Sequence, residues 1–529
     1  MEYYLKPSVK FEPLIWRWYA WPHLIPPTTA ACNIVERHLK IMQSFIENPQ
    51  IHMEAVKNPK LLGGPFIDLE IERVEEVKDF IKTTKKECET LINLNSHIKE
   101  FDQMLQREAQ GDSLEAYYQR LPVSLRGFVE LVYDVNHRPA IRFIEALLYK
   151  TYYSDKSQAI ALSAMSDDTR KFVLSTPRLE QADELYFNIP FSDPNLDKLF
   201  RMREEPDHFS SIQENLPIPD IKHQLFHSFF TTTAPSLPED RNYIGEGVRL
   251  RYFGHACVLL QTKSVSILFD PVVSYSMQNS SIPRFTLSDL PDHIDYVIIT
   301  HNHQDHLMFE TLLQLKYKIG QIIFPANNSG ALQDPSLKLI LKHIGFNSLN
   351  EMKEMESHSI EGGEIIAIPF LGEHADLNIQ TKLSYCVKLG AKNFLFAADS
   401  NNLDSVLYDH IFKEIGSIDV LFLGMECDGA PLTWLYGPLL TQPLKRSFDR
   451  NRTLSGSNFD KAWLIAEKAK CKKAYVYAMG QEPWLNFIMA LKYTEQSPQM
   501  IESNKFIQAC KNKGIESERL FGKKEWILF

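Results

Sequence analysis

The sequence predicts a protein of mixed α and β structure in two parts, a largely helical N-terminal part followed by an α/β C-terminal part. At 529 residues the chain is too long for one ordinary hydrophobic core. Apolar residues recur at helical spacing through much of residues 1–240, which predicts helices. From residue 248 onward, short runs of β-branched and aromatic residues that end in turns or polar segments predict strands.

The composition limits the possible partners and the compartment. Hydrophobic residues make up 44% of the chain and charged residues 23%, the balance of a soluble globular protein. The net charge of −10 and the pI near 6.0 argue against nucleic acid and anionic membranes as partners. The sequence has no apolar run of membrane-spanning length and no signal peptide at its start. Its seven cysteines are scattered, which favours a reducing compartment, and we expect a cytoplasmic protein.

The N-terminal domain is expected to cover residues 1–240, and it contains no chemical motif and no internal repeat. We expect it to serve as a scaffold, a dimer interface or a lid over the substrate. Residues 1–27, rich in aromatic residues and proline, are expected to form a strand or an irregular arm. The first predicted helix covers residues 28–48 and is ended by Pro49. Further helices are predicted over 73–107, from Ser113 to an interruption at Pro122, and over 128–153. A strand is predicted over 184–191.

A linker is predicted next. Residues 231–247 are polar and contain proline and glycine, as flexible connections do. The catalytic domain is expected to follow as residues 248–529.

The richest chemical signal in the sequence lies after a predicted buried strand at 296–299. The next residues carry His301, His303, Asp305 and His306 within six positions, and a packed core has no need of such a group. Alternate residues of an extended segment point the same way, so His301 and His303 can bind one metal ion. The turn that follows can direct Asp305 and His306 at a second ion.

The segments before this motif have a recognisable pattern. Residues 248–260 predict a strand pair with a Gly-His turn, and residues 264–270 predict a strand that ends in Asp-Pro. Together with the His-x-His-x-Asp-His motif, they resemble the metallo-β-lactamase superfamily. This resemblance implies an αββα sandwich with one or two metal ions at the edge of its sheets.

The same resemblance implies further ligands at two later strand ends, after residues 364–370 and 393–398. Asp399 falls where the superfamily keeps a carboxylate that bridges two ions, a role that suits its two oxygens. Glu373 and His374 both follow the earlier strand. Because neighbouring residues of an extended segment point in opposite directions, we expect one of them to bind metal, and a hydrolase would use His374.

The last expected ligand separates two branches of the superfamily. Two-zinc hydrolases use a histidine near the end of the domain, whereas this chain has no histidine after His410. The non-haem diiron β-hydroxylases, the family of the chloramphenicol-pathway enzyme, lack that histidine, replace another with glutamate and have a large N-terminal domain. Glu373 and Asp399 fall at matching positions, and residues 424–429 and 433–438 also resemble this family.

This second resemblance implies an O₂-dependent monooxygenase of antibiotic or related natural-product biosynthesis. The enzyme would hydroxylate the β-carbon of an amino acid held as a thioester on a nonribosomal peptide synthetase carrier domain. Two iron ions are the implied cofactors, with O₂ as co-substrate. The electrons are expected from an external electron-transfer partner, because the sequence has no flavin or NAD fingerprint. We also expect a homodimer.

The predicted metal ligands are three imidazoles and three carboxylates: His301, His303, His306, Asp305, Glu373 and Asp399. Hard oxygen ligands favour iron or manganese relative to zinc, in agreement with the resemblance. The candidates for the pocket are Glu426, Asp428 and Tyr436, although Glu426 and Asp428 could equally cap a turn. His255 and Asp270 are expected to support the site without binding metal, and His374 could hydrogen-bond to a ligand carboxylate.

Two other functions fit parts of the sequence. A binuclear hydrolase would use a metal-activated water on a phosphodiester, thioester or lactam. A non-enzymatic partner of a synthetase would keep a relic site, and the complete set of ligands argues against it. One further feature is the basic run at 445–452, which we expect either to dock an acidic carrier domain or to form a solvated loop.

Overall fold

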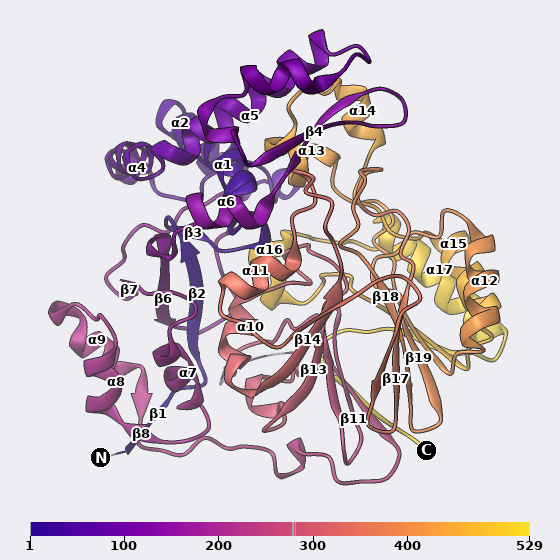
Figure 1. Ribbon diagram of the computed structural model, residues 1–529. Helices are drawn as coiled ribbons and strands as arrows, with labels where there is room; N and C mark the ends of the chain where they lie inside the picture. Colours follow the sequence, from indigo (N-terminus) through magenta and orange to yellow (C-terminus); the bar gives the residue numbers. More distant parts are fainter. Residues whose placement is uncertain (1, 278–279, 281) are drawn as a thin grey trace.

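The protein is described by a computed structural model that covers residues 2–277, 280 and 282–529. Its C-terminal part is a sandwich of two seven-stranded sheets (Figure 1). The first sheet runs in the order β15 (Leu349–Met352), β14 (Ile319–Pro325), β13 (Ile294–Ile298), β12 (Ser266–Phe269), β11 (Cys257–Gln261), β10 (Val248–Gly254) and β23 (Lys524–Leu528). The second runs in the order β16 (Ser357–Ile360), β17 (Gly363–Ile368), β18 (Ser384–Leu389), β19 (Lys392–Phe396), β20 (Val420–Gly424), β21 (Lys473–Tyr477) and β22 (Glu516–Arg519).

Helices cover both outer faces of this sandwich, so the predicted αββα architecture is confirmed. The sheets pack through a buried cluster that includes Phe269, Ile298, Val387 and Phe396, in which the rings of Phe269 and Phe396 stack at 3.8 Å. Helices α10 (Phe309–Leu315) and α11 (Leu337–His343) pack on the first sheet. The second sheet is covered by α12 (Ser405–Ile415), α15 (Phe459–Ala469) and α17 (Pro498–Asn512).

The N-terminal part combines small sheets with a layer of helices. Its sheets run in the orders β8 (Asp207–His208), β1 (Glu2–Leu5), β9 (Phe230–Thr231); β3 (Trp18–Tyr19), β2 (Val9–Ile15), β6 (Gln158–Ala164), β7 (Leu185–Asn188); and β4 (Val129–Tyr133), β5 (Pro139–Phe143). Its helices are α1 (Pro27–Asn33), the π-helix η2 (Ile34–Leu39), α2 (Lys40–Glu47), α3 (Pro49–Lys57), α4 (Val74–Glu87), α5 (Glu89–Glu108), α6 (Glu145–Tyr152), α7 (Pro194–Arg201), α8 (Phe209–Asn215) and α9 (His223–Ser228). Within the described chain, none of the helices is long and apolar enough to cross a bilayer.

The helix predicted over 128–153 is wrong in its first half, which forms the hairpin β4–β5 before α6 begins. The Asp134 side chain accepts hydrogen bonds from the backbone amides of Asn136 at 2.8 Å and Arg138 at 2.9 Å, which closes a turn. Pro139 cannot continue a helix there, because it lacks a backbone N–H. In β4 the burial alternates, with Val129 and Leu131 buried and Glu130 exposed, as a strand requires.

The other N-terminal predictions fared better. The helix predicted over 28–48 is present as α1, η2 and α2 in one run, starting one residue earlier at Pro27. The long helix predicted over 73–107 is two helices, α4 and α5, which meet at Cys88. The segment that starts at Ser113 is a 3-10 helix (Leu114–Arg120), and the predicted strand at 184–191 is β7.

The two parts share one hydrophobic core and one buried ionic network. Phe11 and Phe200 of the N-terminal part belong to the same buried cluster as Leu312 on α10. Arg170, from the N-terminal part, donates hydrogen bonds to Glu310 on α10 at 2.8 and 3.0 Å and to Glu12 on β2 at 2.7 Å. Such a buried pair loses stability when one partner is removed, so this contact fixes the N-terminal part against α10.

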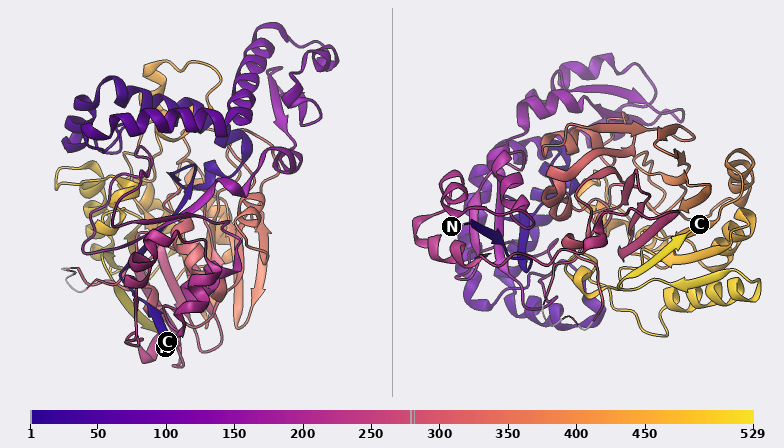
Figure 2. Two further views of the ribbon diagram at one scale, coloured as in Figure 1. Left: turned by 90° about the vertical axis from the view of Figure 1, so that its left-hand side faces the viewer. Right: turned by 90° about the horizontal axis from the view of Figure 1, so that it is seen from below.

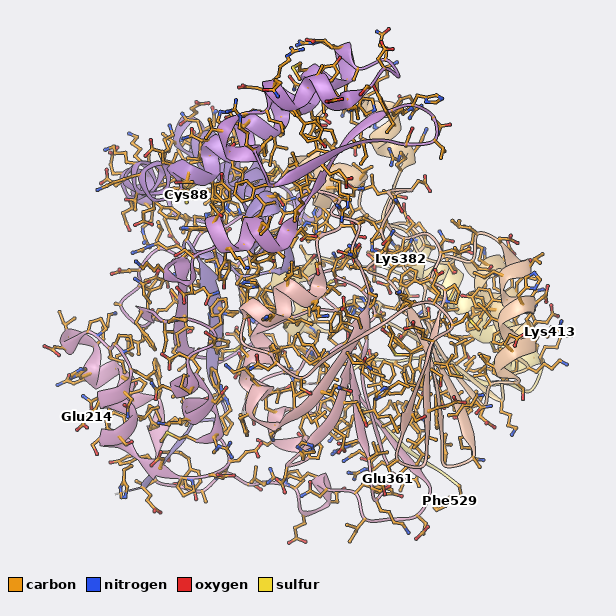
Figure 3. All side chains as sticks on the ribbon, viewed as in Figure 1. Cys88, Glu214, Glu361, Lys382, Lys413 and Phe529 are labelled. Atoms are coloured by element: carbon orange, nitrogen blue, oxygen red, sulfur yellow. The ribbon has the colours of Figure 1, made fainter. Side chains whose placement is uncertain are left out.

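The N-terminal helices lie over one end of the sandwich. In Figures 1 and 2, helices α1, α2, α4, α5 and α6 form a layer above the sheets. Figure 3 shows Lys382 at that end, whereas Glu361 and the C-terminal Phe529 lie at the opposite end. Lys382 forms an isolated β-bridge with His301, so the predicted metal loop lies at the end that the N-terminal helices cover.

Candidate metal centre

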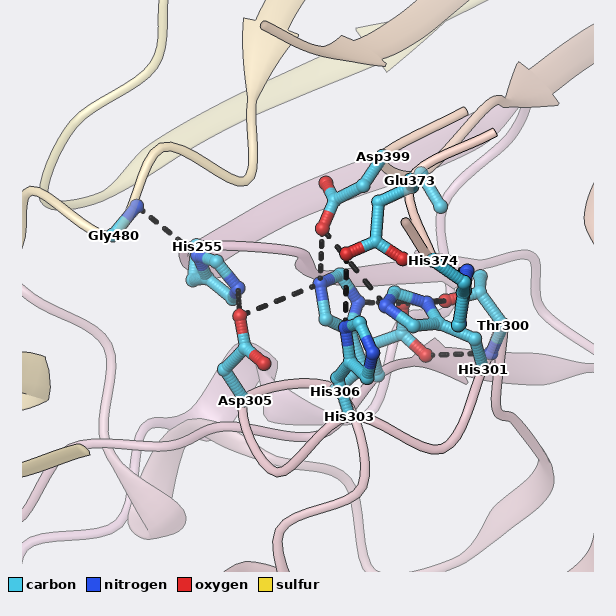
Figure 4. Close-up of polar contacts among 12 residues, drawn as sticks. His255, Thr300, His301, His303, Asp305, His306, Glu373, His374, Asp399 and Gly480 are labelled. Carbon is cyan, nitrogen blue, oxygen red and sulfur yellow. Dashed lines mark hydrogen bonds and ion pairs between the residues drawn. The ribbon is translucent and has the colours of Figure 1, made fainter. Parts of the chain in front are cut away.

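Three strand ends bring the predicted metal ligands together (Figure 4). His301, His303, Asp305 and His306 lie in the loop between β13 and α10. Glu373 lies in the loop after β17, and Asp399 follows β19. All six residues are buried, with exposed fractions of 7% or less.

The backbone around the site adopts left-handed conformations at several strand ends. The φ angles are 51° at His255, 35° at Asp270, 66° at Glu373 and 48° at Ala398. Residues other than glycine rarely adopt positive φ, and such strain concentrates where a site dictates the geometry. A second constraint is Gly424 at the end of β20, where a Cβ atom would lie 2.5 Å from Asp399 Oδ1.

The first group of donors is His301, His303 and Glu373, whose ligand atoms lie within 4.8 Å of one another. His303 Nδ1 lies 3.0 Å from Glu373 Oε1. His301 Nδ1 lies 3.0 Å from Thr300 Oγ1, which itself donates to Asp270. The Nδ1 atom of His301 therefore carries the proton, and its Nε2 lone pair is available to a metal ion.

The second group is formed around His306 and Asp399, whose Nε2 and Oδ2 atoms lie 3.0 Å apart. Asp305 Oδ2 lies 3.7 Å from the same nitrogen. On the other edge of the ring, His306 Nδ1 donates to Asp270 Oδ2 at 2.8 Å. This carboxylate–histidine arrangement fixes the tautomer and orients the ring, as in many metal sites.

His255 forms a candidate metal-binding group with Asp305 and His306, but its hydrogen bonds favour a tautomer whose proton faces Asp305. Its Nδ1 accepts a hydrogen bond from the Gly480 amide at 3.1 Å, so the proton resides on Nε2. Nε2 then donates to Asp305 Oδ2 at 3.1 Å. His255 and Asp270 thus both contact predicted ligands, Asp305 and His306.

Opposite charges compensate one another within the cluster. Burial alone would raise the pKa of Glu373, but the imidazoles of His303 and His374 outweigh it and lower that pKa to about 2. Burial would lower the pKa of His306, but the carboxylates of Asp399, Asp270 and Asp305 raise it well above its usual value. The pKa of Glu373 thus stays low enough for its carboxylate to remain ionised, and its negative charge suits a bound cation.

Several buried polar atoms indicate where cations fit. Within the described residues, His301 Nε2 and Asp399 Oδ1 have no hydrogen-bond partner. His301 Nε2 lies 3.9 Å from Asp399 Oδ2, whereas Asp399 Oδ1 faces Gly424. Leaving a buried lone pair such as that of His301 Nε2 unpaired is costly, and a bound cation would satisfy it. The residues therefore fit a pair of metal ions, with three imidazoles and three carboxylates available to hold them.

The expectation that Glu373 and His374 point in opposite directions is wrong. The loop is not extended, because Gly372 and Glu373 have φ angles of 69° and 66°, so both side chains turn toward the site. His374 Nδ1 lies 2.8 Å from Glu373 Oε2, and its ring lies 4.6 Å from that of His303. This is the contact to a ligand carboxylate that the sequence suggested for His374.

Two of the three pocket candidates lie beside the cluster. The Tyr436 hydroxyl, at the end of α13 (Leu432–Tyr436), lies 3.3 Å from His303 Nε2. Burial, together with Asp399, Asp305 and Glu373, raises the pKa of Glu426 well above its usual value. The Asp428 side chain is exposed instead, because its segment turns outward and its carbonyl is bonded by Gln499 at 2.6 Å.

Two residues near the site had no signal in the sequence. Tyr493 donates a hydrogen bond to Glu426 at 3.3 Å. His23 reaches the site from the N-terminal part, where its ring lies 6.1 Å from that of Tyr436. Neither belongs to a motif, and only the folded chain brings them near the metal loop.

The αββα sandwich with this buried set of histidines and carboxylates at its edge defines the metallo-β-lactamase class. A β-lactamase superfamily domain matches residues 266–430, and a diiron non-heme β-hydroxylase N-terminal domain matches residues 4–235. A relative from Streptomyces venezuelae, 4-amino-L-phenylalanyl-[CmlP-peptidyl-carrier-protein] 3-hydroxylase, is 36% identical over 526 residues, which cover 98% of each chain. The chain belongs to the diiron non-heme β-hydroxylase family.

Solved structures agree with this assignment. The crystal structure of CmlA, a diiron β-hydroxylase from Streptomyces venezuelae, superposes with a TM-score of 0.93 at 35% identity and covers 100% of both chains. A more distant sequence relative, a metal-dependent hydrolase from Natranaerobius thermophilus, is 26% identical over 122 residues. The match covers 22% of this chain and 52% of the relative. The protein is thus a diiron β-hydroxylase with two iron ions as its family cofactor, and the hydrolase alternative is not favoured.

Replacing Glu373 with alanine should remove a ligand and cause loss of iron or of activity. His374→Ala should be milder, with a loss of about 10–100-fold, because His374 acts through Glu373. Iron content and turnover of the two purified variants measure the difference. Loss of metal from His374→Ala but not from Glu373→Ala would show that the ligand assignment is reversed.

Proposed function

We propose that the protein hydroxylates the β-carbon of an amino acid tethered as a thioester to a carrier domain, using O₂ and electrons from an external donor. The observation that carries this proposal is the donor set. Glu373 stands where a hydrolase would place a histidine, and the segment after β21 contacts His255 through the Gly480 backbone amide and supplies no histidine. Three carboxylates suit iron in oxidised states better than a histidine-rich zinc site.

On this proposal, His301, His303 and Glu373 would hold one iron and Asp305 and His306 the other, with Asp399 available to both groups. When bound, the iron pair supplies the binding and reduction of O₂. Asp270 accepts a hydrogen bond from Nδ1 on the outward edge of His306, and the Gly480 amide leaves the proton of His255 on Nε2, which donates to Asp305. Glu426, with its raised pKa, holds a proton on its carboxyl group beside Asp399 and Glu373.

The nature of the substrate is supported by the relative from Streptomyces venezuelae. Its name specifies a 4-aminophenylalanyl group on a peptidyl carrier protein. We propose a carrier-bound amino acid for this chain too. The surrounding fold agrees, because the N-terminal helices cover the metal loop (Figure 1) and a cavity lies where η2, residues 63–65 and α13 meet.

The direct test supplies the iron-loaded protein with a chemical reductant, O₂ and carrier domains loaded with different amino acids, including 4-amino-L-phenylalanine. We expect the mass of one carrier-bound amino acid to increase by one oxygen atom, located at the β-carbon. The anaerobic reaction is the control. Release of the amino acid by thioester hydrolysis, with or without O₂, would instead support the hydrolase.

The docking surface for the carrier is proposed at α14 (Arg446–Asn451). Lys445, Arg446 and Arg450 are exposed there. Asp449 accepts hydrogen bonds from Thr433 on α13, and Arg452 donates to the Ala375 carbonyl in the Glu373 loop. The helix is therefore tied to two elements of the site, and its cations suit an acidic carrier and the phosphate of its arm.

Reversal of two charges tests this surface. Arg446→Glu together with Arg450→Glu should slow turnover of the carrier-bound substrate, mostly through association, and should weaken its dependence on salt. Iron content should not change. The matched control, Lys413→Glu with Lys511→Glu, makes the same charge change on α12 and α17. If the α14 variant has the same turnover and salt dependence as the parent protein, the carrier domain docks on another surface.

We also propose that the electrons come from a separate electron-transfer protein and that the enzyme acts as a homodimer in the cytoplasm. All seven cysteines lie in the described part of the chain and are free, which suits a reducing compartment. The homodimer remains a prediction from the sequence.

A further inference from the structure

His23, from the N-terminal part, lies beside Tyr436, which in turn contacts the metal loop. It lies in the 3-10 turn η1 (Pro22–Leu24) and is completely buried. Its ring stacks on Trp21 with centroids 4.9 Å apart and planes 12° apart. Its other aromatic neighbour is Tyr436, whose ring centroid lies 6.1 Å from that of His23. The Tyr436 hydroxyl lies 3.3 Å from His303 Nε2.

Neither ring nitrogen of His23 has a hydrogen-bond partner within the described residues. Buried polar groups are nearly always paired, and an unpaired donor and acceptor on one ring are unfavourable. Packing alone would be served better by phenylalanine, which would keep the stack on Trp21. The imidazole therefore needs an explanation outside the folded chain.

His23 is held in place by its surroundings. The guanidinium of Arg37, on η2, lies 5.6 Å from the Trp21 ring and donates hydrogen bonds to the carbonyls of Trp434 and Leu435 on α13. Arg37 thus ties the Trp21–His23 stack to the helix that carries Tyr436. Burial, followed by the charges of His303, Arg37 and His374, lowers the pKa of His23 to about 3, so the ring is neutral and offers one donor and one acceptor.

A cavity lies near this stack, beside Arg37 and residues of α13. This cavity, of about 530 Å³, opens where η2, residues 63–65 and α13 meet, and Arg37 and Trp434 line it. Its walls come from both parts of the chain and are more apolar than polar. Arg37 lines this cavity and also lies 5.6 Å from the Trp21 ring on which His23 stacks.

We propose that His23 binds the aminoacyl group of the carrier-tethered substrate and positions it at the metal loop. This rests on the proposed function, because an aminoacyl thioester is the ligand that it assigns to the site. The thioester carbonyl accepts a hydrogen bond and the α-amine can donate one, which matches the donor and acceptor of a neutral imidazole. The N-terminal part is then a component of the substrate site as well as a cover over it.

The test compares affinities for a carrier domain with and without its amino acid. The parent protein is first measured against phosphopantetheinylated carrier domains that are unloaded or loaded with single amino acids, including 4-amino-L-phenylalanine. His23→Phe should weaken binding of the preferred loaded carrier by about 10-fold or more, because it removes both nitrogens. Binding of the unloaded carrier, iron content and the diferric absorption should not change.

Two further variants separate positioning from packing. His23→Gln restores a donor and an acceptor and should recover part of the affinity. His38→Phe is the matched control, since His38 is also buried and stacks on a tryptophan, Trp18, at 3.9 Å. It should bind both carriers as the parent does, because burial and Arg37, rather than groups of the metal loop, lower the pKa of His38.

The outcomes distinguish this inference from the proposed function. The role of His23 would be overturned if the His23→Phe variant binds the loaded carrier as tightly as the parent protein does. The same conclusion would follow if the variant loses affinity equally for the loaded and the unloaded carrier. If the parent protein binds every loaded carrier domain no more tightly than the unloaded one, that result would contradict the proposed function itself.

Discussion

The structure depends on balancing the charge of a buried cluster in which six ligand-type side chains converge. Carboxylates cannot be buried ionised without cations or hydrogen-bond donors close by. Here Glu373 and Asp399 lie 3.0 Å from His303 and His306, and Asp305 lies 3.1 Å from His255. His301 Nε2 has no hydrogen-bond partner among the described residues and lies 3.9 Å from Asp399 Oδ2. Metal ions bound between these groups would further balance the charge of this interior.

The rest of the fold holds that cluster in a fixed geometry. The ligands sit on loops at the ends of buried strands, and left-handed backbone at His255, Asp270 and Glu373 aims the side chains inward. Asp270 orients both Thr300 and His306, and the Gly480 amide orients His255. From the other side, Arg170 fixes the N-terminal part to α10, the helix that directly follows the metal loop. Covering the loop excludes water, which strengthens every electrostatic interaction inside.

The sequence predicted the sandwich and most of the cluster because these features are local. A buried strand followed by His-x-His-x-Asp-His carries its own geometry, and the Asp-Pro and Gly-His turns mark neighbouring strand ends. The orientation of Glu373 and His374 was mispredicted because it depends on a left-handed loop that residue order alone does not reveal. The hairpin at 129–143 was missed because short apolar runs suit a helix or a strand equally well. His23 and Tyr493 reach the site through contacts between segments far apart in sequence, which no local pattern records.

The central claim is that this donor set holds two irons for O₂ chemistry, whereas a hydrolase would hold zinc. Metal analysis and absorption spectroscopy of protein from iron-replete cells test it most directly. The account predicts two iron ions per chain, as the family has, and the ultraviolet absorption of an oxo-bridged diferric pair. Stoichiometric zinc in the purified protein, together with an iron-loaded form that does not react with O₂ after reduction, would contradict it.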